Sequence, residues 1–264
     1  QTEGFGTLFN AICGQPVDVN FISFDDVING DISQYDVLVN TGLAGSAFQG
    51  DYYWKNEKLL TKIREYVANG GGFVGIGDPS GYQYNGKYFQ LSDVLGVDKE
   101  VGFTYALNKA FDSVNSKHWI TEDIDLKDIK FGKQGQYVYP KEADVIICSL
   151  NEQNPTQNTI AGGDVFLSVN SYGKGRSVFL SSLNDTYNGY RLIYKILLWA
   201  GHKEDNYLRG LSSNPEADCY FYKDKNSYAL LNNTNNVIET KFYDVDKVEE
   251  TLKLQPHEIR WIKR

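Results

Sequence analysis

The stretch from Asn56 to Gly77 constrains the fold of this chain more than any other, because it joins an amphipathic helix directly to a buried strand. Apolar residues recur with helical spacing at Leu59, Leu60, Ile63, Tyr66 and Val67. Gly70–Gly72 ends the helix, and Phe73–Gly77 is apolar on both faces, as in a central strand of a parallel sheet. The succession predicts an open α/β sheet.

Other segments supply further elements of such a domain. Helical spacing or capping residues predict helices at 5–13, from Ser23 onward, 90–95 and 188–200. Short apolar or alternating runs predict strands at 17–22, 36–40, 145–148, 165–169 and 177–180. The last two runs flank Tyr172–Gly175, a good hairpin turn. We therefore expect an α/β domain over residues 1–205 with a doubly wound, mostly parallel sheet.

The pattern changes after residue 201. A polar stretch ends at Asn214-Pro215, and from there the chain alternates short strands with turns. The strands are predicted at 219–222, 228–231, 237–242, 249–254 and 259–262. We expect a small antiparallel β domain over residues 215–264.

Composition excludes several classes of function. The formal net charge is −8, and no basic stripe is present to bind the phosphates of a nucleic acid. No apolar run approaches the ~18 residues of a membrane helix. The three cysteines are widely spaced without a CxxC, and the three histidines lack metal-ligand spacing. We expect buried cysteines, no metal site, no membrane contact and a reducing, cytoplasmic location.

The best candidate site follows the buried strand. Ligands of open α/β sheets gather beyond the carboxyl ends of the strands. Asp78, Ser80, Tyr82 and Tyr84 are therefore candidates for substrate or interface binding, with a plain turn as the alternative. Pro79 precedes Ser80, so the segment is not a nucleophile elbow, and no catalytic residue is predicted. Residues 70–75 match the GxGxxG pattern of dinucleotide-binding sites, but in such sites the pattern follows a strand and opens a helix. Here it follows a helix, so we interpret these glycines as the end of that helix.

Six segments, in order along the chain, resemble the galacto-N-biose/lacto-N-biose phosphorylases, also called 1,3-β-galactosyl-N-acetylhexosamine phosphorylases. These segments are Pro16–Asp26, Gly70–Ser80, Phe89–Asp98, Tyr172–Val178, Ser212–Glu216 and Asn232–Thr234. Together they span nearly the whole chain, which makes the resemblance more specific than any one motif.

The resemblance implies that catalysis and the other functions of the protein belong to different domains. Members of this family carry an N-terminal (β/α)8 barrel with the catalytic acid and the phosphate site. A glutamine-amidotransferase-like middle domain and a small C-terminal β domain follow. This chain matches only the last two, so no catalytic position can be carried over, and its own enzymatic status stays open. The absence of any methionine also favours a fragment whose middle domain starts late.

The implied reaction is reversible phosphorolysis of galactosyl-β-1,3-N-acetylhexosamine to galactose 1-phosphate and the N-acetylhexosamine. Inorganic phosphate is the co-substrate, and no metal or organic cofactor is needed. The fragment is expected to support the barrel and a homodimer. Its docking face is expected to expose aromatic residues that crowd the loops, namely Tyr52, Tyr53, Trp54, Tyr82, Tyr84, Tyr88 and Phe89.

Two other readings stay open. The chain resembles a phosphorylase only in its non-catalytic part, so it is alternatively a free-standing carbohydrate-binding or interaction module. An amidotransferase-like hydrolase is less favoured, because that chemistry needs a nucleophile on a strained turn and the sequence offers none.

Overall fold

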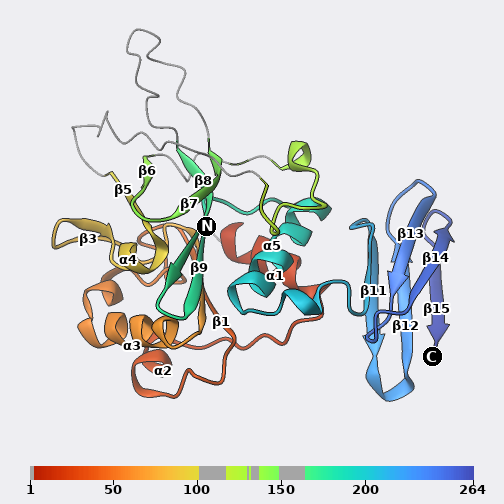
Figure 1. The fold of residues 1–264 in the computed structure, drawn as a ribbon, viewed down its shortest axis with the longest axis horizontal. Helices are drawn as coiled ribbons and strands as arrows, with labels where there is room; N and C mark the ends of the chain where they lie inside the picture. Colours follow the sequence, from red (N-terminus) through yellow and green to blue (C-terminus); the bar gives the residue numbers. More distant parts are fainter. Residues whose placement is uncertain (1–2, 101–116, 130, 132–136, 149–163) are drawn as a thin grey trace, which may run out of the picture.

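The computed structural model describes residues 3–100, 117–129, 131, 137–148 and 164–264. Its larger part is built on a five-stranded sheet with the order β1-β2-β9-β8-β7, flanked by helices (Figure 1). The sequence of residues 98–140 indicates loops and short strands, and 101–116, 130 and 132–136 of this range lie outside the described residues.

The central strand is the one expected. β2 (Gly72–Gly77) is buried along its whole length and runs parallel to β1 (Val37–Gly42) and β9 (Gly175–Leu180). β8 (Val165–Tyr172) runs antiparallel to both of its neighbours, β9 and β7 (Asp144–Cys148), because it returns to β9 through the predicted hairpin turn. β7 therefore runs in the same direction as β1, β2 and β9. The described sheet is thus mostly parallel, as expected, and the reversed direction of β8 makes it mixed.

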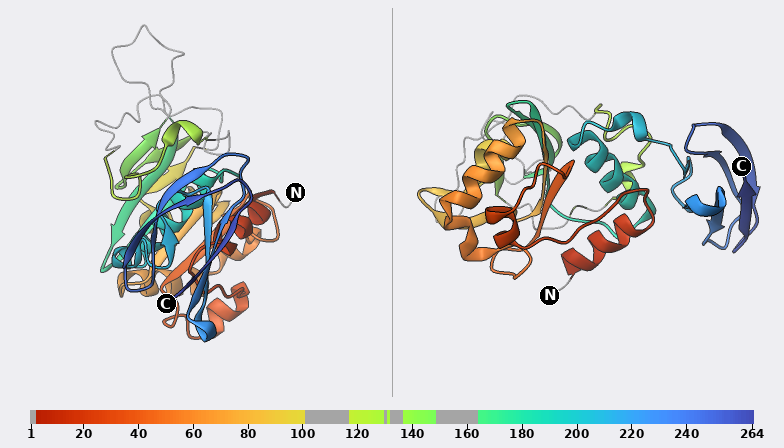
Figure 2. Two further views of the ribbon diagram at one scale, coloured as in Figure 1. Left: turned by 90° about the vertical axis from the view of Figure 1, so that its right-hand side faces the viewer. Right: turned by 90° about the horizontal axis from the view of Figure 1, so that it is seen from below.

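Helices cover both faces of the sheet (Figure 2, right). α2 (Phe24–Asn29), α3 (Glu57–Ala68) and α4 (Ser92–Leu95) belong to one face. α1 (Glu3–Cys13) and α5 (Tyr187–Ala200) belong to the other. The side chains of β2 alternate between two hydrophobic cores. Phe73 packs in the core beneath α2, α3 and α4, which we call the first core, and Val74 and Ile76 pack in the core beneath α1 and α5, which we call the second core.

Short-range chemistry fixes where helices begin. Ser23 accepts a hydrogen bond from the backbone N–H of Asp26, and the Asp26 carboxylate accepts one from the Ser23 N–H in return, which makes a capping box. Asn56 caps α3 by accepting from the N–H of Lys58 at 3.0 Å. Both starts agree with the predicted ones.

The strand predicted at 17–22 is wrong. This segment has no regular structure, and Val19 and Phe21 are 45% and 66% exposed. Alternation predicts a half-buried strand only where a neighbouring strand receives the apolar face. Here the segment pairs with no strand of the described sheets, so Val19 and Phe21 face outward, and of the three alternating residues Val17 packs against a buried cluster.

Short elements connect the larger ones. β3 (Gly81–Tyr84) pairs with β4 (Lys87–Phe89), and β5 (Val97–Lys99) pairs with β6 (Val138–Pro140). Single turns of 3₁₀ helix lie at η1 (Asp51–Lys55), η2 (Leu126–Asp128), η4 (Glu204–Asn206) and η5 (Lys223–Lys225). The β3–β4 hairpin directly follows β2 and therefore shapes the candidate site.

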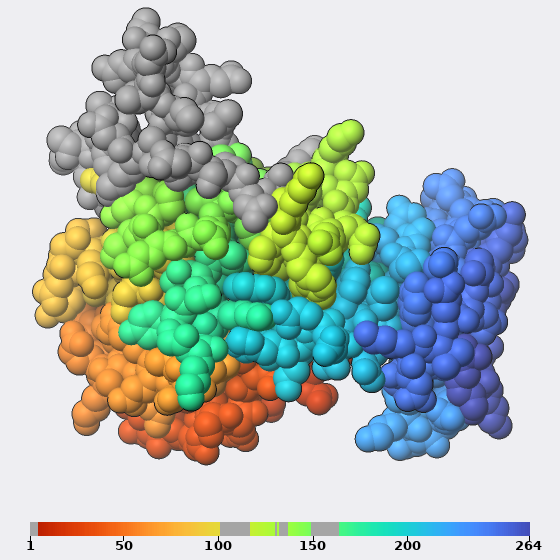
Figure 3. All heavy atoms as spheres, viewed as in Figure 1, coloured from red at the N-terminus to blue at the C-terminus, as the bar shows by residue number. Residues whose placement is uncertain are grey.

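The C-terminal part forms a separate lobe (Figure 3), which is built of strands. Its two antiparallel sheets have the orders β10-β13-β14 and β11-β12-β15. The six strands are β10 (Leu211–Ser212), β11 (Ala217–Tyr222), β12 (Ser227–Asn232), β13 (Ile238–Tyr243), β14 (Glu249–Leu254) and β15 (Ile259–Lys263). The five predicted strands are confirmed. The two-residue β10 is too short to leave a pattern.

Arg191 of α5 ties the two lobes together. Its side chain is 4% exposed, and its Nη2 donates to the carbonyl of Ser212 at 2.8 Å. Of the three cysteines, Cys219 is buried in the strand lobe as expected, Cys148 is half-buried, and Cys13 is exposed at the end of α1. Within the described ranges, no helix combines the length and the apolar character needed to cross a membrane.

Candidate binding site beyond the central strands

The candidate site lies where β1 and β2 end side by side. Gly42 is in register with Gly77, and the N–H of Asp78 donates to the Gly42 carbonyl at 2.9 Å. The chain then turns through Asp78 and Ser80 into the β3–β4 hairpin. This position, at the carboxyl end of neighbouring parallel strands, is the one that the sequence predicts.

Asp78 forms a buried ion pair. Its carboxylate lies 2.6 Å from the Nζ of Lys99, and the two side chains are 8% and 16% exposed. The other carboxylate oxygen accepts from the N–H of Ala44 at 3.2 Å. Lys99 also lies 5.3 Å from the ring centre of Tyr88. Asp78 thus holds the loop after β1 to β5.

The Tyr88 phenol stays protonated in this setting. Its burial raises the pKa of the Tyr88 hydroxyl to about 12, and the charge of Asp78 adds to the effect. Tyr88 is therefore an uncharged ring beside the ion pair at neutral pH.

Ser80 is fully buried and has a left-handed backbone, with φ of 51°. Its N–H donates to the Oδ1 of Asn40 at 3.0 Å, and its Oγ accepts from the N–H of Leu91 at 3.1 Å. These contacts join β1, the turn and the start of α4. Because the Ser80 hydroxyl accepts a hydrogen bond from the backbone of Leu91, a structural role is favoured over a nucleophilic one.

Gln49 and Asn40 complete the polar cluster, and neither was singled out from the sequence. Gln49 Nε2 donates to the carbonyls of Asp78 and Gly81, both at 2.9 Å. Asn40 Nδ2 donates to the Gln49 carbonyl at 3.1 Å. Asn40 is a polar residue within an apolar strand, which is a signal that sequence analysis can use. Gln49 and Lys99 carry no such signal.

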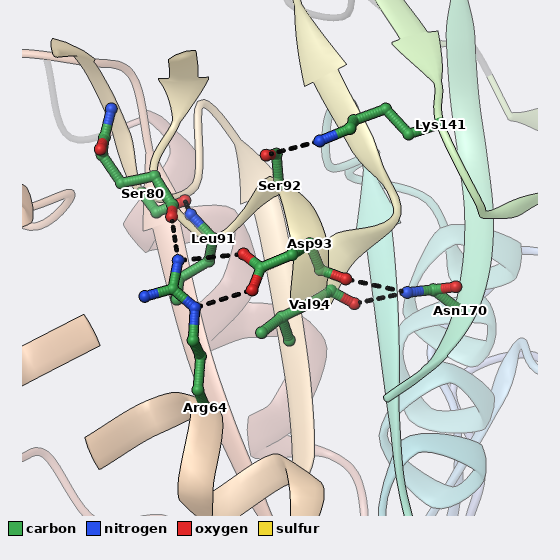
Figure 4. Close-up of polar contacts among 9 residues, drawn as sticks. Arg64, Ser80, Leu91, Ser92, Asp93, Val94, Lys141 and Asn170 are labelled. Atoms are coloured by element: carbon green, nitrogen blue, oxygen red, sulfur yellow. Dashed lines mark hydrogen bonds and ion pairs between the residues drawn. The ribbon is translucent and has the colours of Figure 1, made fainter. Parts of the chain in front are cut away.

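A second polar network fixes α4 beside the site (Figure 4). Arg64 of α3 pairs with Asp93 at 2.7 Å and donates to the Gln90 carbonyl at 2.8 Å. Burial alone would raise the pKa of Asp93, but the Arg64 guanidinium outweighs it and lowers that pKa. From β8, Asn170 donates to the Val94 carbonyl at 2.8 Å. The segment after the hairpin is thus anchored to both α3 and the sheet.

The four predicted site residues separate into two pairs. Asp78 and Ser80 lie inside, whereas Tyr84 is 39% exposed and Tyr82 is half-buried. The Lys55 ammonium lies 4.8 Å from the Tyr82 ring centre and 6.0 Å from that of Tyr84. We call Lys55, Tyr82 and Tyr84 the tyrosine surface. It offers two rings and a cation to a ligand or a neighbouring domain.

The predicted aromatic docking face is only partly present. Tyr52 and Tyr84 are exposed, and Tyr53, Tyr82 and Tyr88 are half-buried. The prediction is wrong for Trp54 and Phe89, which are 1% and 0% exposed. Both rings belong to the first core, where they gain more from burial than a loop context suggests.

Another exposed apolar group lies beside α1. The Phe5 ring contacts Phe21 and Phe48, with ring centres 5.6 and 4.7 Å apart. Phe9 follows one helical turn after Phe5 and is 45% exposed. We call Phe5, Phe9, Phe21 and Phe48 the phenylalanine patch.

The described part of the chain holds no group of three or more His, Cys, Asp or Glu side chains able to bind a metal ion. His118 lies edge-on to Trp199, and His257 contacts Asn235. Neither contact includes a residue of the candidate site around Asp78 and Ser80.

Comparison with known proteins finds two family models and several relatives that match this chain. The family model of the lacto-N-biose phosphorylase central domain matches residues 1–205, and that of the C-terminal domain matches residues 210–262. A 1,3-β-galactosyl-N-acetylhexosamine phosphorylase of Lachnoclostridium phytofermentans is 34% identical over 99% of this chain. One of Bifidobacterium longum subsp. longum is 33% identical, also over 99%. A D-galactosyl-β-1→4-L-rhamnose phosphorylase of L. phytofermentans is 25% identical over 87%.

The chain spans only 35%, 38% and 30% of the lengths of these three relatives. Among solved structures, a β-galactosidase from Rahnella sp. R3 aligns with 97% of this chain and 35% of its own, with a TM-score of 0.54 and 14% identity. At that identity the likeness concerns the fold alone.

Proposed function

The chain belongs to the lacto-N-biose phosphorylase family, and from this premise we propose that it is the C-terminal accessory portion of a disaccharide phosphorylase. The proposed division is an amidotransferase-like α/β domain at 1–205 and a β domain at 215–264. The intact protein would phosphorolyse galactosyl-β-1,3-N-acetylhexosamine reversibly to galactose 1-phosphate and N-acetylhexosamine, with inorganic phosphate as co-substrate and no other cofactor. The names of the more similar relatives support this substrate.

The accessory role rests chiefly on one observation: two acidic side chains beside the central strands already form ion pairs within the chain. Asp78 pairs with Lys99, and Asp93 pairs with Arg64. Phosphorolysis needs a general acid and an anion site in one cleft. We propose that both lie in a barrel outside this chain, which is compatible with the greater length of the relatives. The direct test is an assay of galactose 1-phosphate release by this chain and by the intact protein.

Contact with the barrel would use exposed apolar surface. The phenylalanine patch is favoured, because it gathers four aromatic side chains beside the edge strand β1, including Phe21 at 66% exposure. A homodimer of the intact enzyme is part of the same proposal. The free-standing carbohydrate-binding or interaction module stays the alternative function.

The tyrosine surface is proposed to contribute binding or interface contacts without taking part in bond cleavage. In the intact enzyme, replacing Tyr82 and Tyr84 together by alanine is expected to raise KM or weaken assembly, because both rings are lost while the buried turn at Asp78 and Ser80 stays intact. Steady-state kinetics and sedimentation measure the two effects.

The matched control is the double variant Tyr82→Phe and Tyr84→Phe, which keeps both rings. We expect it to resemble the wild type. If the alanine variant also keeps its kinetics and its oligomeric state, the segment is a simple connector and this role is rejected.

A further inference from the structure

The outer face of the sheet β11-β12-β15 carries a row of aromatic rings. Tyr220 is paired with Ala229, and Ala229 with Trp261, so that these side chains project from the same face. Tyr222 lies on that face too, two residues after Tyr220. Tyr220, Tyr222 and Trp261 are 37%, 44% and 60% exposed, whereas Ala229 between them is 3% exposed. We call the three rings the aromatic platform.

Two of the three rings of the platform are in contact. The rings of Tyr222 and Trp261 have centres 5.2 Å apart. Ala229 on the central strand is small, and the rings from the two outer strands leave it only 3% exposed. Flat, exposed rings around a small buried residue offer a broad apolar surface at little entropic cost, since aromatic side chains have few rotatable bonds.

A groove adjoins the platform between the two lobes. It has a volume of about 410 Å³ and is lined by the turn after α1, residues 13–18, and by Gly210 and 219–222. Tyr220 and Tyr222 therefore belong to both the platform and the groove. The volume is within the range of small-molecule sites, roughly 300–1,000 Å³. In its lining, the Oε1 of Gln15 is buried without a hydrogen-bond partner in the described structure.

The charges of the residues that line the groove indicate which class of ligand it can bind. Its charged residue is Asp18, and no lysine or arginine belongs to the lining, while the whole chain carries a net charge of −8. An anionic ligand is therefore disfavoured. Ring faces suit the C–H face of a pyranose, and the Tyr220 and Tyr222 hydroxyls, the Gln15 amide and the Asp18 carboxylate suit its hydroxyl groups.

We propose that the aromatic platform and the adjoining groove form a binding site for a neutral oligosaccharide. The site is built wholly from the described residues of this chain, and it does not depend on the proposed phosphorylase activity. One sugar ring stacks across Tyr222 and Trp261, and the next enters the groove beside Tyr220 and Gln15.

Binding is tested by titrating this chain with lacto-N-tetraose, β-1,4-galactotetraose and cellotetraose by isothermal calorimetry. The readout of location is acrylamide quenching of tryptophan fluorescence, compared between the wild type and Trp261→Phe. Trp261 is 60% exposed, whereas Trp119 and Trp199 are half-buried and Trp54 is 1% exposed, so the difference between the two proteins isolates the signal of Trp261. We expect at least one probe to bind with a millimolar or tighter Kd and to protect the fluorescence from quenching.

Three variants separate stacking from general effects. Trp261→Ala should weaken that binding at least about tenfold, the equivalent of one stacking contact. Trp261→Phe keeps a ring and should stay close to wild type. Val248→Ala removes a 55% exposed apolar residue outside the platform, in the same lobe, and should change nothing.

The groove has its own variant. A Cβ built on Gly14 has no heavy atom nearer than the Asp218 Oδ1 at 3.9 Å and the Tyr220 Oη at 4.0 Å, so there is room for a side chain to begin here, and Gly14→Leu adds bulk at a residue that lines the groove. We expect it to weaken binding severalfold while unfolding unchanged in urea.

Several results would overturn the proposal. One is the absence of binding by all three probes; another is binding that Trp261→Ala and Gly14→Leu leave unaltered. A third is that Trp261→Ala changes only the sedimentation of the chain, since the platform would then join two copies of the protein.

Discussion

Replacing Trp54 by alanine is expected to lower the free energy of unfolding by about 3–5 kcal/mol, the usual cost of removing a fully buried large aromatic side chain. Trp54 is 1% exposed and packs edge-on against Phe24, with ring centres 5.4 Å apart. Its Nε1 also donates to the Gln49 carbonyl at 2.6 Å, which links the first core to the polar cluster. Urea unfolding followed by circular dichroism measures the change.

Tyr52→Ala is the matched control, because Tyr52 lies two residues earlier in η1 and is 64% exposed. Its effect should stay within about 0.5 kcal/mol. Equal losses in the two variants would mean that Trp54 does not anchor the core as its burial implies.

Replacing Asp78 by asparagine is expected to cost about 3–5 kcal/mol of stability, because the Lys99 ammonium then stays in a buried place without its counter-charge. The pair is only 8% and 16% exposed, so water does little to compensate. The loop that holds Ala44 is also weakened, since its N–H loses a charged acceptor. Equilibrium unfolding of the single variant gives the first number.

A double variant separates the ion pair from the rest of the site. With Lys99→Met added, the unpaired charge is gone, and we expect part of the lost stability to return. A double variant no more stable than Asp78→Asn alone would show that Lys99 contributes nothing to the effect. The cost would then lie in the Asp78 hydrogen bonds.

The elements that local chemistry determines could be predicted from the sequence. Helix α3 follows from its apolar spacing and its Asn56 cap, and β2 follows from an apolar run after glycines. The antiparallel pairing of β8 with β9 was implied by the hairpin turn at 172–175. The expectation of a mostly parallel sheet is confirmed, and that turn explains why β8 alone runs in the opposite direction.

The predictions that were wrong concern residues whose environment is set by segments far away in the sequence. The strand at 17–22 needed a neighbour that the described sheets do not provide, and Trp54 and Phe89 are buried by residues far along the chain. At the site, the positions of Asp78 and Ser80 followed from the end of β2. Their partners did not, because Lys99 lies 21 residues after Asp78, and Gln49 lies 29 residues before it.

The central claim is that this chain serves a phosphorylase whose chemistry lies in another part of the protein. The most direct measurement is the release of galactose 1-phosphate from galactosyl-β-1,3-N-acetylglucosamine and galactosyl-β-1,3-N-acetylgalactosamine, with and without inorganic phosphate. We expect phosphate-dependent release by the intact protein and none above a no-protein control by these 264 residues alone. Release by the chain alone would contradict the account, as would an intact, folded protein that leaves both disaccharides uncleaved.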